Sequence, residues 1–381
     1  MKQAWKTRAL SATAIATLAA TSVAAGGVER TTQSVGILFE EGNVAELSFG
    51  SVNPTVSGVG AGAAASALQP TPGVPSGDMT DSYVRFGFSY KHQFNENLSF
   101  ALIHDQPFGA NVTYPLTGYY ASGATAELKS NALTGVLKYT TDNNVSVFGG
   151  LRYQTLEAVA SGVPTAGGAY AGVSNNDGSV GYLAGVAYER PDIALRVALT
   201  YNSAITHDWS ISETVGAGPA VAGTTSVTTP QSVNLEFQSG IAQDTLVFGS
   251  IRWVDWSEMR VAPDVYSAAT GGGALVAYDE DTITYNLGLG RRFNDTWSGA
   301  VSLTHEPQVG GFARNLGPTD GRTGVTLAAT YKHENMEITG GVSYIWIGDA
   351  DTRVSHLSPV AAGEFRDNTA IAGGVRVRFR F

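Results

Sequence analysis

The sequence predicts an all-β protein, a transmembrane antiparallel β-barrel of about 14 strands with a short N-terminal plug. Three observations predict this fold class. The last strand has one apolar and one basic face, short polar turns alternate with long loops, and the apolar faces of the predicted strands carry no Lys or Arg. Together they describe a cylinder whose outer surface meets lipid and whose lumen is wet and charged.

The C-terminal residues 374–381 alternate strictly between apolar and basic side chains. Because successive side chains of a strand point to opposite faces, the segment predicts one oily and one charged face, which suit lipid and lumen respectively. A charged edge strand of a soluble β-protein is the alternative interpretation, since charge also prevents edge pairing. The apolar face consists of Val375, Val377, Phe379 and Phe381, and the basic face of Arg376, Arg378 and Arg380.

Composition and the first residues indicate a secreted chain. Only 15% of the 381 residues are charged, and the absence of cysteine excludes disulfides and thiolate chemistry. Residues 1–25 predict a cleaved signal peptide, with Lys2, Lys6 and Arg8 ahead of a short apolar run that is too short to span a membrane. The remaining chain has 23 − 3 = 20 basic residues against 33 acidic ones, which argues against nucleic acid as a partner.

Short polar turns and long loops alternate from residue 43 to residue 381, the predicted barrel domain. Six short turns and seven long connections join fourteen strands, and two rims of unequal loop length are typical of outer-membrane barrels. The short turns are predicted at 95–97, 142–144, 191–192, 243–244, 294–295 and 333–335. The Gly/Ala/Pro-rich loops are predicted at 60–77, 115–123, 160–176, 208–229, 262–280, 307–320 and 351–366.

The apolar faces of the predicted strands support the barrel strand by strand. In one of them Leu133, Leu137 and Tyr139 share a face that carries no basic residue. A Lys or Arg facing lipid at mid-membrane would cost roughly 2–4 kcal/mol, so these faces are assigned to the exterior. Aromatic residues gather on the same faces beside the short turns, as expected at a membrane–water boundary. They are Tyr90, Tyr139, Tyr188, Trp297, Tyr331 and Phe381.

The opposite faces turn a mixed set of side chains into the lumen. Apolar residues lie among cations, and inward acids are few, chiefly Glu46 and Glu236. Such a lining suits an amphiphile with an apolar body and an anionic head. Alternatively, the aromatic residues only fill the barrel and the cations lie at its wet ends. The candidate ligand contacts are Phe148, Arg152, Phe248, Arg252, Trp256, Ile345 and Ile347.

The third predicted strand is interrupted in its middle. Proline cannot donate to a strand ladder and glycine permits unusual dihedral angles, so Pro107 and Gly109 predict a break or an inward kink that opens the wall. The alternative is a strand that ends early, with Pro107 starting a loop. The predicted kink comprises Asp105, Gln106, Pro107, Phe108 and Gly109.

Residues 26–42 precede the first strand and mix polar with apolar side chains. An unplugged barrel of this width would leak, so the segment is predicted to be a plug, with Ile37, Leu38 and Phe39 as its apolar contacts. A disordered tail is the alternative.

Residues 230–257, which end in Trp253-Val254-Asp255-Trp256-Ser257, resemble the FadL family of outer-membrane transporters for long-chain fatty acids and other hydrophobic compounds. Residues 281–297 and 321–346 are similar to that family too. The resemblance implies fourteen strands, an N-terminal hatch, and a kinked third strand that opens a lateral path for passive diffusion. The sequence departs from the family at the hatch, which is short and lacks the family's N-P-A-type motif.

The predicted function is therefore an outer-membrane channel for passive uptake of hydrophobic compounds, with long-chain fatty acids as the expected substrate. Substrate would bind in an apolar lumen and leave laterally through the kinked strand. An adhesin or structural barrel is the alternative, followed by a lipid-acting barrel enzyme, although the six histidines are scattered and no G-x-S-x-G occurs.

Several partners follow from this prediction. Besides its substrate, the chain is expected to meet outer-membrane lipid and lipopolysaccharide, and to be assembled by the barrel assembly machinery through the C-terminal strand that ends in Phe381. No cofactor or metal is expected, and the chain is expected to be a monomer.

Overall fold

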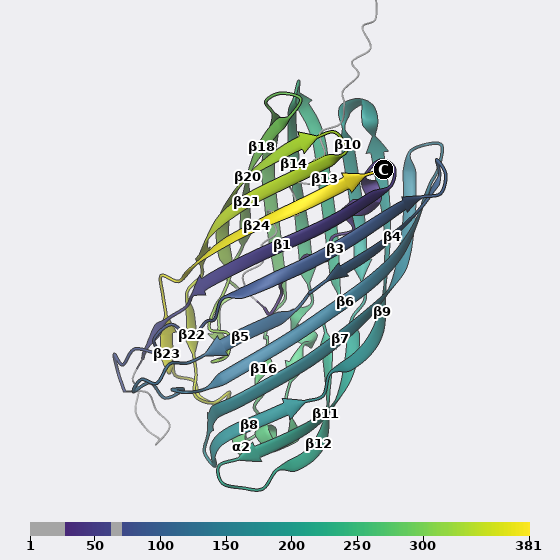
Figure 1. The fold of residues 1–381 in the computed structure, drawn as a ribbon. Helices are drawn as coiled ribbons and strands as arrows, with labels where there is room; N and C mark the ends of the chain where they lie inside the picture. The colour runs from purple at the N-terminus through teal and green to yellow at the C-terminus, as the bar shows by residue number, and fades with distance from the viewer. Residues whose placement is uncertain (1–26, 62–70) are drawn as a thin grey trace, which may run out of the picture.

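The computed structural model describes residues 27–61 and 71–381, so the predicted signal peptide lies outside the described residues. The main sheet closes on itself as a 14-strand antiparallel β-barrel (Figure 1). β24 (Thr369–Arg380) completes the closure, because it pairs with β21 (Met336–Ile347) on one side and with β1 (Val44–Thr55) on the other. The fold class predicted from the sequence is confirmed.

The wall follows the chain order, with the third strand in two pieces, β4 and β5. The strands between β1 and β21 are β3 (Tyr83–Gln93), β4 (Leu98–Asp105), β5 (Gly109–Thr113), β6 (Thr125–Thr140), β7 (Val145–Thr165), β9 (Asp177–Arg190), β10 (Leu195–Asn202), β13 (Ser232–Ala242), β14 (Thr245–Val254), β17 (Thr282–Arg292), β18 (Trp297–Glu306) and β20 (Arg322–His333).

Smaller elements decorate the loops and the N-terminal segment. They are η1 (Gly36–Phe39), β2 (Gly58–Gly60), β8 (Gly168–Ser174), η2 (Pro191–Ile193), β11 (Ile205–Val215), β12 (Val221–Thr229), η3 (Trp256–Glu258), β15 (Arg260–Val261), α2 (Asp264–Thr270), β16 (Val276–Ala277), β19 (Phe312–Ala313), β22 (Ala350–Thr352) and β23 (Gly363–Phe365). Among the described residues, no helix is long and apolar enough to cross a membrane.

All six predicted short turns join consecutive wall strands, and they lie at one rim with the C-terminus (Figure 1). We call this rim the short-turn end and the opposite rim the long-loop end. The apolar strand faces point outward, as the exposed Val84, Leu133, Leu287 and Leu327 show. An exterior of this kind suits lipid, since apolar side chains there need no aqueous partner.

Aromatic side chains pack in pairs on the outer surface beside the short turns. The rings of Tyr90 and Phe381 stack with centroids 6.2 Å apart, and those of Trp297 and Tyr331 lie 5.1 Å apart. Trp297 and Tyr331 lie on the paired strands β18 and β20, whereas Tyr90 and Phe381 meet across β1.

Two of the seven long connections are not the irregular loops that composition suggested. β7 continues to Thr165 and turns into β8, and residues 205–229 form the hairpin of β11 and β12. β11 also pairs with β8, so the two hairpins extend the wall beyond the barrel at the long-loop end (Figure 1). Small residues hid the strand pattern: β8 and β12 are rich in Gly, Ala, Ser and Thr, which alternate weakly in hydrophobicity.

The described part of the plug, residues 27–42, lies inside the barrel. Ile37 and Leu38 are buried and pack against Val44 and against Val136 and Phe148 of the wall. The short N-terminal plug predicted as part of the fold is thus confirmed, and its contacts with the kinked strand define the candidate site.

Candidate functional site

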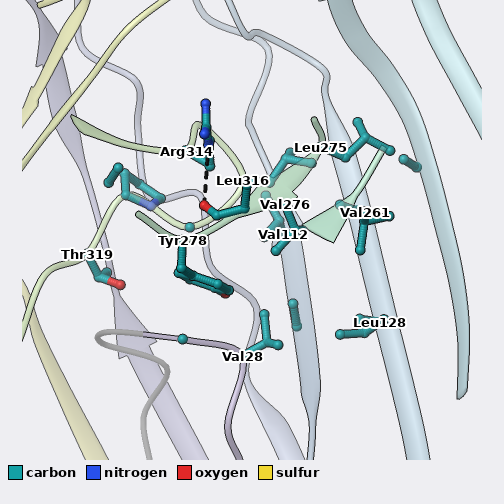
Figure 2. Close-up of a pocket in the computed structure, with 18 of the residues that line it drawn as sticks. Val28, Val112, Leu128, Val261, Leu275, Val276, Tyr278, Arg314, Leu316 and Thr319 are labelled. Carbon is teal, nitrogen blue, oxygen red and sulfur yellow. Dashed lines mark hydrogen bonds between the residues drawn. The ribbon is translucent and has the colours of Figure 1, made fainter. Parts of the chain in front are cut away.

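An apolar cavity lies inside the barrel toward the long-loop end (Figure 2). It contains about 1730 Å³ of space, part of it open to solvent. β5 and β6 contribute one wall, and the segments after β14 and β19 fold back over the lumen as a cover. The lining includes Val28, Val112, Leu128, Val261, Leu275, Val276, Tyr278 and Leu316. Aliphatic and aromatic walls of this kind bind apolar ligands.

The cover is held in place by aromatic packing at its base. The Trp256 ring lies 5.0 Å from the Tyr278 ring and 6.0 Å, edge to face, from the ring of Phe108 in the kink. Edge-to-face and tilted aromatic contacts add to the free energy gained by burial. The loop between β14 and β17 is thereby fixed against the kinked strand.

A buried carboxylate fixes the short helix α2 of the same cover. The backbone N–H groups of Val265 and Tyr266 donate to Glu213 at 3.3 and 3.1 Å, and the Tyr170 hydroxyl donates to it at 3.2 Å. A carboxylate at a helix N-terminus satisfies N–H groups that have no partner within the helix. Glu213 of β11 therefore joins the hairpin extension to the cover.

The kink is a one-residue bulge in the pairing with β6. Asp105 of β4 pairs with Ala132, and Gly109 of β5 pairs with Lys129, so four steps on one strand match three on the other. Within the bulge, Ser130 Oγ accepts from the Phe108 N–H at 2.8 Å and donates to the Phe108 carbonyl at 2.7 Å. The pairing of the third strand is interrupted at these residues and resumes at Gly109.

On the β3 side the same stretch interrupts the strand ladder, and we call this gap in the pairing the wall window. β3 pairs with β4 as far as Phe88 and His104, and the next pair is the isolated bridge of Thr80 with Val112. Among the described residues, 83–87 have no ladder partner on this side. One side chain crosses the window, because Gln106 Oε1 accepts from the Phe86 N–H at 3.2 Å.

The plug pairs with the inner edge of the kink. The Arg30 and Thr31 N–H groups donate to the Pro107 carbonyl at 2.7 and 3.3 Å, and the Gly109 N–H donates to the Val28 carbonyl at 2.8 Å. The Thr31 hydroxyl donates to Asp105 at 2.7 Å. These bonds replace ladder partners that the kinked residues lose, so the inward bend leaves few backbone groups without a partner.

Arg30 lies between the cavity and the wall window. Its guanidinium stands 4.1 Å from the centroid of the Tyr83 ring and donates to Asn111. A Cβ atom on Gly109 would lie 2.5 Å from Arg30 Cζ, so glycine at this position makes room for the guanidinium. A second space, of about 990 Å³, lies next to the window and is lined by Arg85, Phe86 and polar residues of the plug.

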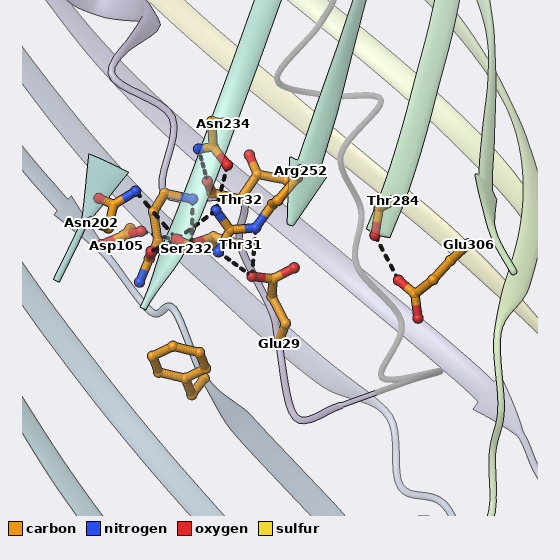
Figure 3. Close-up of polar contacts among 12 residues, drawn as sticks. Glu29, Thr31, Thr32, Asp105, Asn202, Ser232, Asn234, Arg252, Thr284 and Glu306 are labelled. Atoms are coloured by element: carbon orange, nitrogen blue, oxygen red, sulfur yellow. Dashed lines mark hydrogen bonds and ion pairs between the residues drawn. The ribbon is translucent and has the colours of Figure 1, made fainter. Parts of the chain in front are cut away.

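The start of the plug is also bound across the lumen to β13 and β14 (Figure 3). Glu29 accepts from Arg252 Nε at 2.9 Å, and Arg252 Nη1 donates to Ser232 at 3.0 Å. Asn234 donates to the Thr32 carbonyl at 2.8 Å. The backbone of Glu29 also forms an isolated antiparallel β-bridge with Phe108. The buried Glu29–Arg252 ion pair therefore links the kink to the far wall.

At the short-turn end, ion pairs hold the plug's last residues. Glu40 lies 3.0 Å from Arg378 and 2.7 Å from Arg380, and Arg378 also pairs with Glu46 at 2.8 Å. Phe39 packs between two cations, with Lys138 Nζ and Arg196 Cζ each 4.8 Å from its ring centroid. The basic face of the C-terminal strand therefore binds the plug.

All seven predicted lumen contacts are buried, yet the described lining of the cavity includes none of them. The plug covers some: Phe148 packs edge to face on Phe39, with ring centroids 5.9 Å apart. Arg152 donates from Nε to Thr134 at 3.0 Å. Arg252 binds Glu29 and Trp256 supports the cover, so both lie close to the site without lining it.

The remaining three predicted contacts lie in two separate places. Phe248 fills the space over Gly288 of the neighbouring strand. Ile345 and Ile347 belong to a separate buried cluster with Tyr114 at the long-loop end. The sequence reasoning missed Arg30, Tyr83 and the cover residues. An arginine in a plug segment was the one available signal for Arg30, whereas the cover forms by contacts between distant loops.

The fold and site together define a plugged β-barrel with an apolar cavity and a window in its wall. No family model matches the sequence, and no curated protein matches it either.

Solved structures do show this fold. A Pseudomonas aeruginosa FadL homologue has a TM-score of 0.73 at 14% identity over 96% of this chain and 98% of that one. The Pseudomonas putida toluene transporter TodX gives 0.64 at 13% over 100% of both chains. The Ralstonia pickettii toluene transporter TbuX gives 0.63 at 10% over 95% of this chain and 98% of that one. At identities this low, the structural similarity establishes the shared FadL-type barrel fold alone.

Proposed function

We propose that the chain is an outer-membrane channel for the passive uptake of hydrophobic compounds. The observation that carries the proposal is the apolar cavity that ends at the wall window beside the kink. In the proposed orientation the long-loop end faces the exterior and the short-turn end faces the periplasm, as in barrels of this type.

The proposed substrate path is set by the plug, which blocks one end of the lumen, and by the wall window. The plug closes the route to the short-turn end through the Glu29–Arg252 pair and the pairs of Glu40 with Arg378 and Arg380. Substrate in the cavity would instead pass Arg30 and leave sideways through the window into the membrane. Transfer of apolar surface from water into lipid is favourable by about 25 cal/mol per Å², so the whole passage from the external water to the membrane needs no energy source.

The proposed substrates are long-chain fatty acids or other compounds with a large apolar body. The cavity walls are mainly aliphatic and aromatic, which suits an alkyl chain or an apolar ring. TodX and TbuX are toluene transporters, and the third comparison protein is a FadL homologue. These names support a hydrophobic substrate and a role in transport rather than catalysis.

The proposed surroundings are outer-membrane lipid and lipopolysaccharide, with the chain as a monomer. The ring of Phe381 is two-thirds exposed at the short-turn end, where it stacks on Tyr90. This position suits the proposed recognition of the C-terminal strand by the barrel assembly machinery.

A reversible cross-link across the window tests lateral exit. Phe86→Cys and Gln106→Cys place thiols on the two sides of the window, where the native side chain of Gln106 already reaches the Phe86 backbone. The sequence has no other cysteine, so the cross-link is unambiguous. Oxidation should slow uptake of a radiolabelled hydrocarbon and fatty acid by cells that express the variant, and reduction should restore it.

The matched control is Leu287→Cys with Leu303→Cys, register partners on the outer face of β17 and β18, where the ladder is unbroken. Cross-linking this pair should leave uptake unchanged. Full uptake through a verified window cross-link would contradict lateral exit. A chain that takes up neither compound in any state would be an adhesin or structural barrel instead.

A further inference from the structure

The cover of the cavity carries a segment that holds its own shape. β15 and β16 pair as a two-stranded neck, and residues 262–275 between them, which we call the cover tip, include α2. α2 ends at Gly271 in the left-handed conformation, and the Gly272 N–H donates to the Ser267 carbonyl at 2.8 Å. Arg260 Nη2 of the neck donates to the Gly272 carbonyl at 2.7 Å. These bonds lie within the tip and its neck, so they would persist if the tip moved as one body.

The cover tip lies at the long-loop end, between the apolar cavity and the solvent. Pro263 before α2 and Leu275 after it belong to the described cavity lining, whereas no residue of α2 does. Asp264 and Ala268 of α2 are exposed, and the helix lies beside β11 of the hairpin extension (Figure 1). α2 therefore forms the outer layer of the cover, with the cavity behind it.

Little buried surface holds α2 against the wall. None of its seven residues is buried. A helix of this length is not stable alone, because its few internal hydrogen bonds do not offset the cost of ordering it. It is held at the wall by the ring of Tyr266, whose centroid lies 4.9 Å from that of Tyr170, and by its N–H bonds to Glu213. Two residues of the hairpin extension therefore carry much of this attachment.

Glu213 is a buried carboxylate whose described partners are all neutral. It is 1% exposed, and it accepts from the Tyr170 hydroxyl and from the N–H groups of Val265 and Tyr266. Removing a carboxylate from water costs free energy, and hydrogen bonds to the charged oxygens offset that cost. If the tip moved away, Glu213 would lose two of these bonds and regain water. The free energy that keeps the tip closed is therefore a small difference between two large terms.

We propose that the cover tip is a movable gate to the apolar cavity and that Glu213 is the latch that holds it closed. The inference rests on the proposed function and adds an entry step to it, separate from the wall window. Compounds would enter when the tip swings outward on the β15–β16 neck. Trp256 and Tyr278 at the base of the cover would stay packed during this movement.

A reversible tether tests the movement of the tip. Tyr170→Cys and Tyr266→Cys place one thiol on the wall and one on the tip, and a short bis-methanethiosulfonate reagent joins them. The sequence has no other cysteine, so the product is unambiguous. The tether should slow uptake of radiolabelled dodecane by cells expressing the full chain at least about tenfold relative to the untreated variant. Reduction should restore the rate.

The matched control is Ser210→Cys with Thr224→Cys, register partners on the outer face of β11 and β12. A tether there lies within the hairpin extension and leaves the tip free, so uptake should not change. Full uptake through a verified tether between positions 170 and 266 overturns the gate. Equal slowing by both tethers also overturns it, because the effect would then come from the hairpin.

Amide-resolved hydrogen exchange tests the latch without transport. Glu213→Gln removes the charge and turns one of the two acceptor oxygens into a donor. The N–H groups of Val265 and Tyr266 should then exchange about tenfold faster, while plug residues 36–40 stay unchanged. Glu157→Gln on β7 is the control, since that acid accepts neither N–H.

Equal exchange in the natural chain and in Glu213→Gln overturns the latch. If the natural chain takes up no dodecane, the proposed function fails, and the exchange rates still decide whether Glu213 holds the tip.

Discussion

The two halves of the lumen share one wall but are filled in different ways. Toward the short-turn end the plug occupies the interior, and ion pairs of Glu40 with Arg378 and Arg380 bind it to the wall. Toward the long-loop end the interior is an apolar cavity under a cover of packed loops. The comparison shows that ion pairs fix the plug in one half of the lumen, whereas apolar side chains line the cavity in the other half. The kink lies between the two halves.

The largest effect is expected from breaking the closed half. Arg378 is 2% exposed and lies near three carboxylates, those of Glu40, Glu46 and Glu337. Arg378→Met removes the guanidinium nearest to all three acids, while Arg380 and Arg376 still lie beside them, so the free energy of unfolding should fall by roughly 1.5–3 kcal/mol. Urea unfolding in detergent micelles measures the loss.

Arg291→Met serves as the control, because Arg291 is exposed at the same end and donates only to Thr245 among the described residues. Its effect should stay within about 0.5 kcal/mol. Equal stability of the two variants would mean that the ion pairs do not hold the plug.

A smaller effect, on transport instead of stability, is expected at the boundary. Pro107→Val restores a strand N–H, and Gly109→Val places a side chain where the Arg30 guanidinium now lies. The double variant should fold and insert, yet take up hydrocarbon about tenfold more slowly, equivalent to about 1.4 kcal/mol at the exit barrier. Initial uptake rates of the inserted protein measure this, with Leu287→Val on the unbroken wall as the control. An unchanged rate would count against lateral exit.

The smallest effect is a dependence of stability on pH, which should appear in the long-loop half and not in the plugged half. His207 of the hairpin extension is fully buried, with Nδ1 3.2 Å from Asp177. Burial lowers its pKa, which Asp177 only partly opposes. The unfolded histidine, with a pKa of about 6.5, therefore takes up a proton first, and stability falls as the pH drops from there toward the folded pKa, by at most about 1.4 kcal/mol per pH unit.

Hydrogen exchange at about pH 7.5 and about pH 5.5 checks this prediction on either side of the unfolded pKa. Acid should reduce protection in residues 205–229 and leave the plug residues 36–40 unchanged. His207→Gln should abolish the difference. A uniform loss of protection in both halves would contradict the assignment to His207.

The wall was predictable because its signals are local. Alternating side chains gave the outward faces, polar clusters such as 95–97 and 294–295 gave the turns, and Pro107 with Gly109 gave the kink. Each of these patterns depends on residues only a few positions apart. Over that range the residue types determine the preferred backbone conformation.

The site was less predictable because it depends on contacts between distant segments. Alternation placed Phe148 and Arg252 on the correct face, but it could not show that the plug would cover Phe148 or that Glu29 would bind Arg252. The inward Glu337 also escaped notice, because it is the second residue of β21, close to a turn. The cavity cover comes from loops whose fold is set by Trp256, Tyr278 and Glu213 across large sequence separations.

The wall window has a mechanical consequence. Paired residues bound it at both ends, Phe88 with His104 toward the short-turn end and Thr80 with Val112 toward the long-loop end. The barrel wall is therefore continuous at both ends of the wall window. On the proposed lateral route, a solute would pass between these two pairs without breaking either of them, and the barrel would keep its circumference.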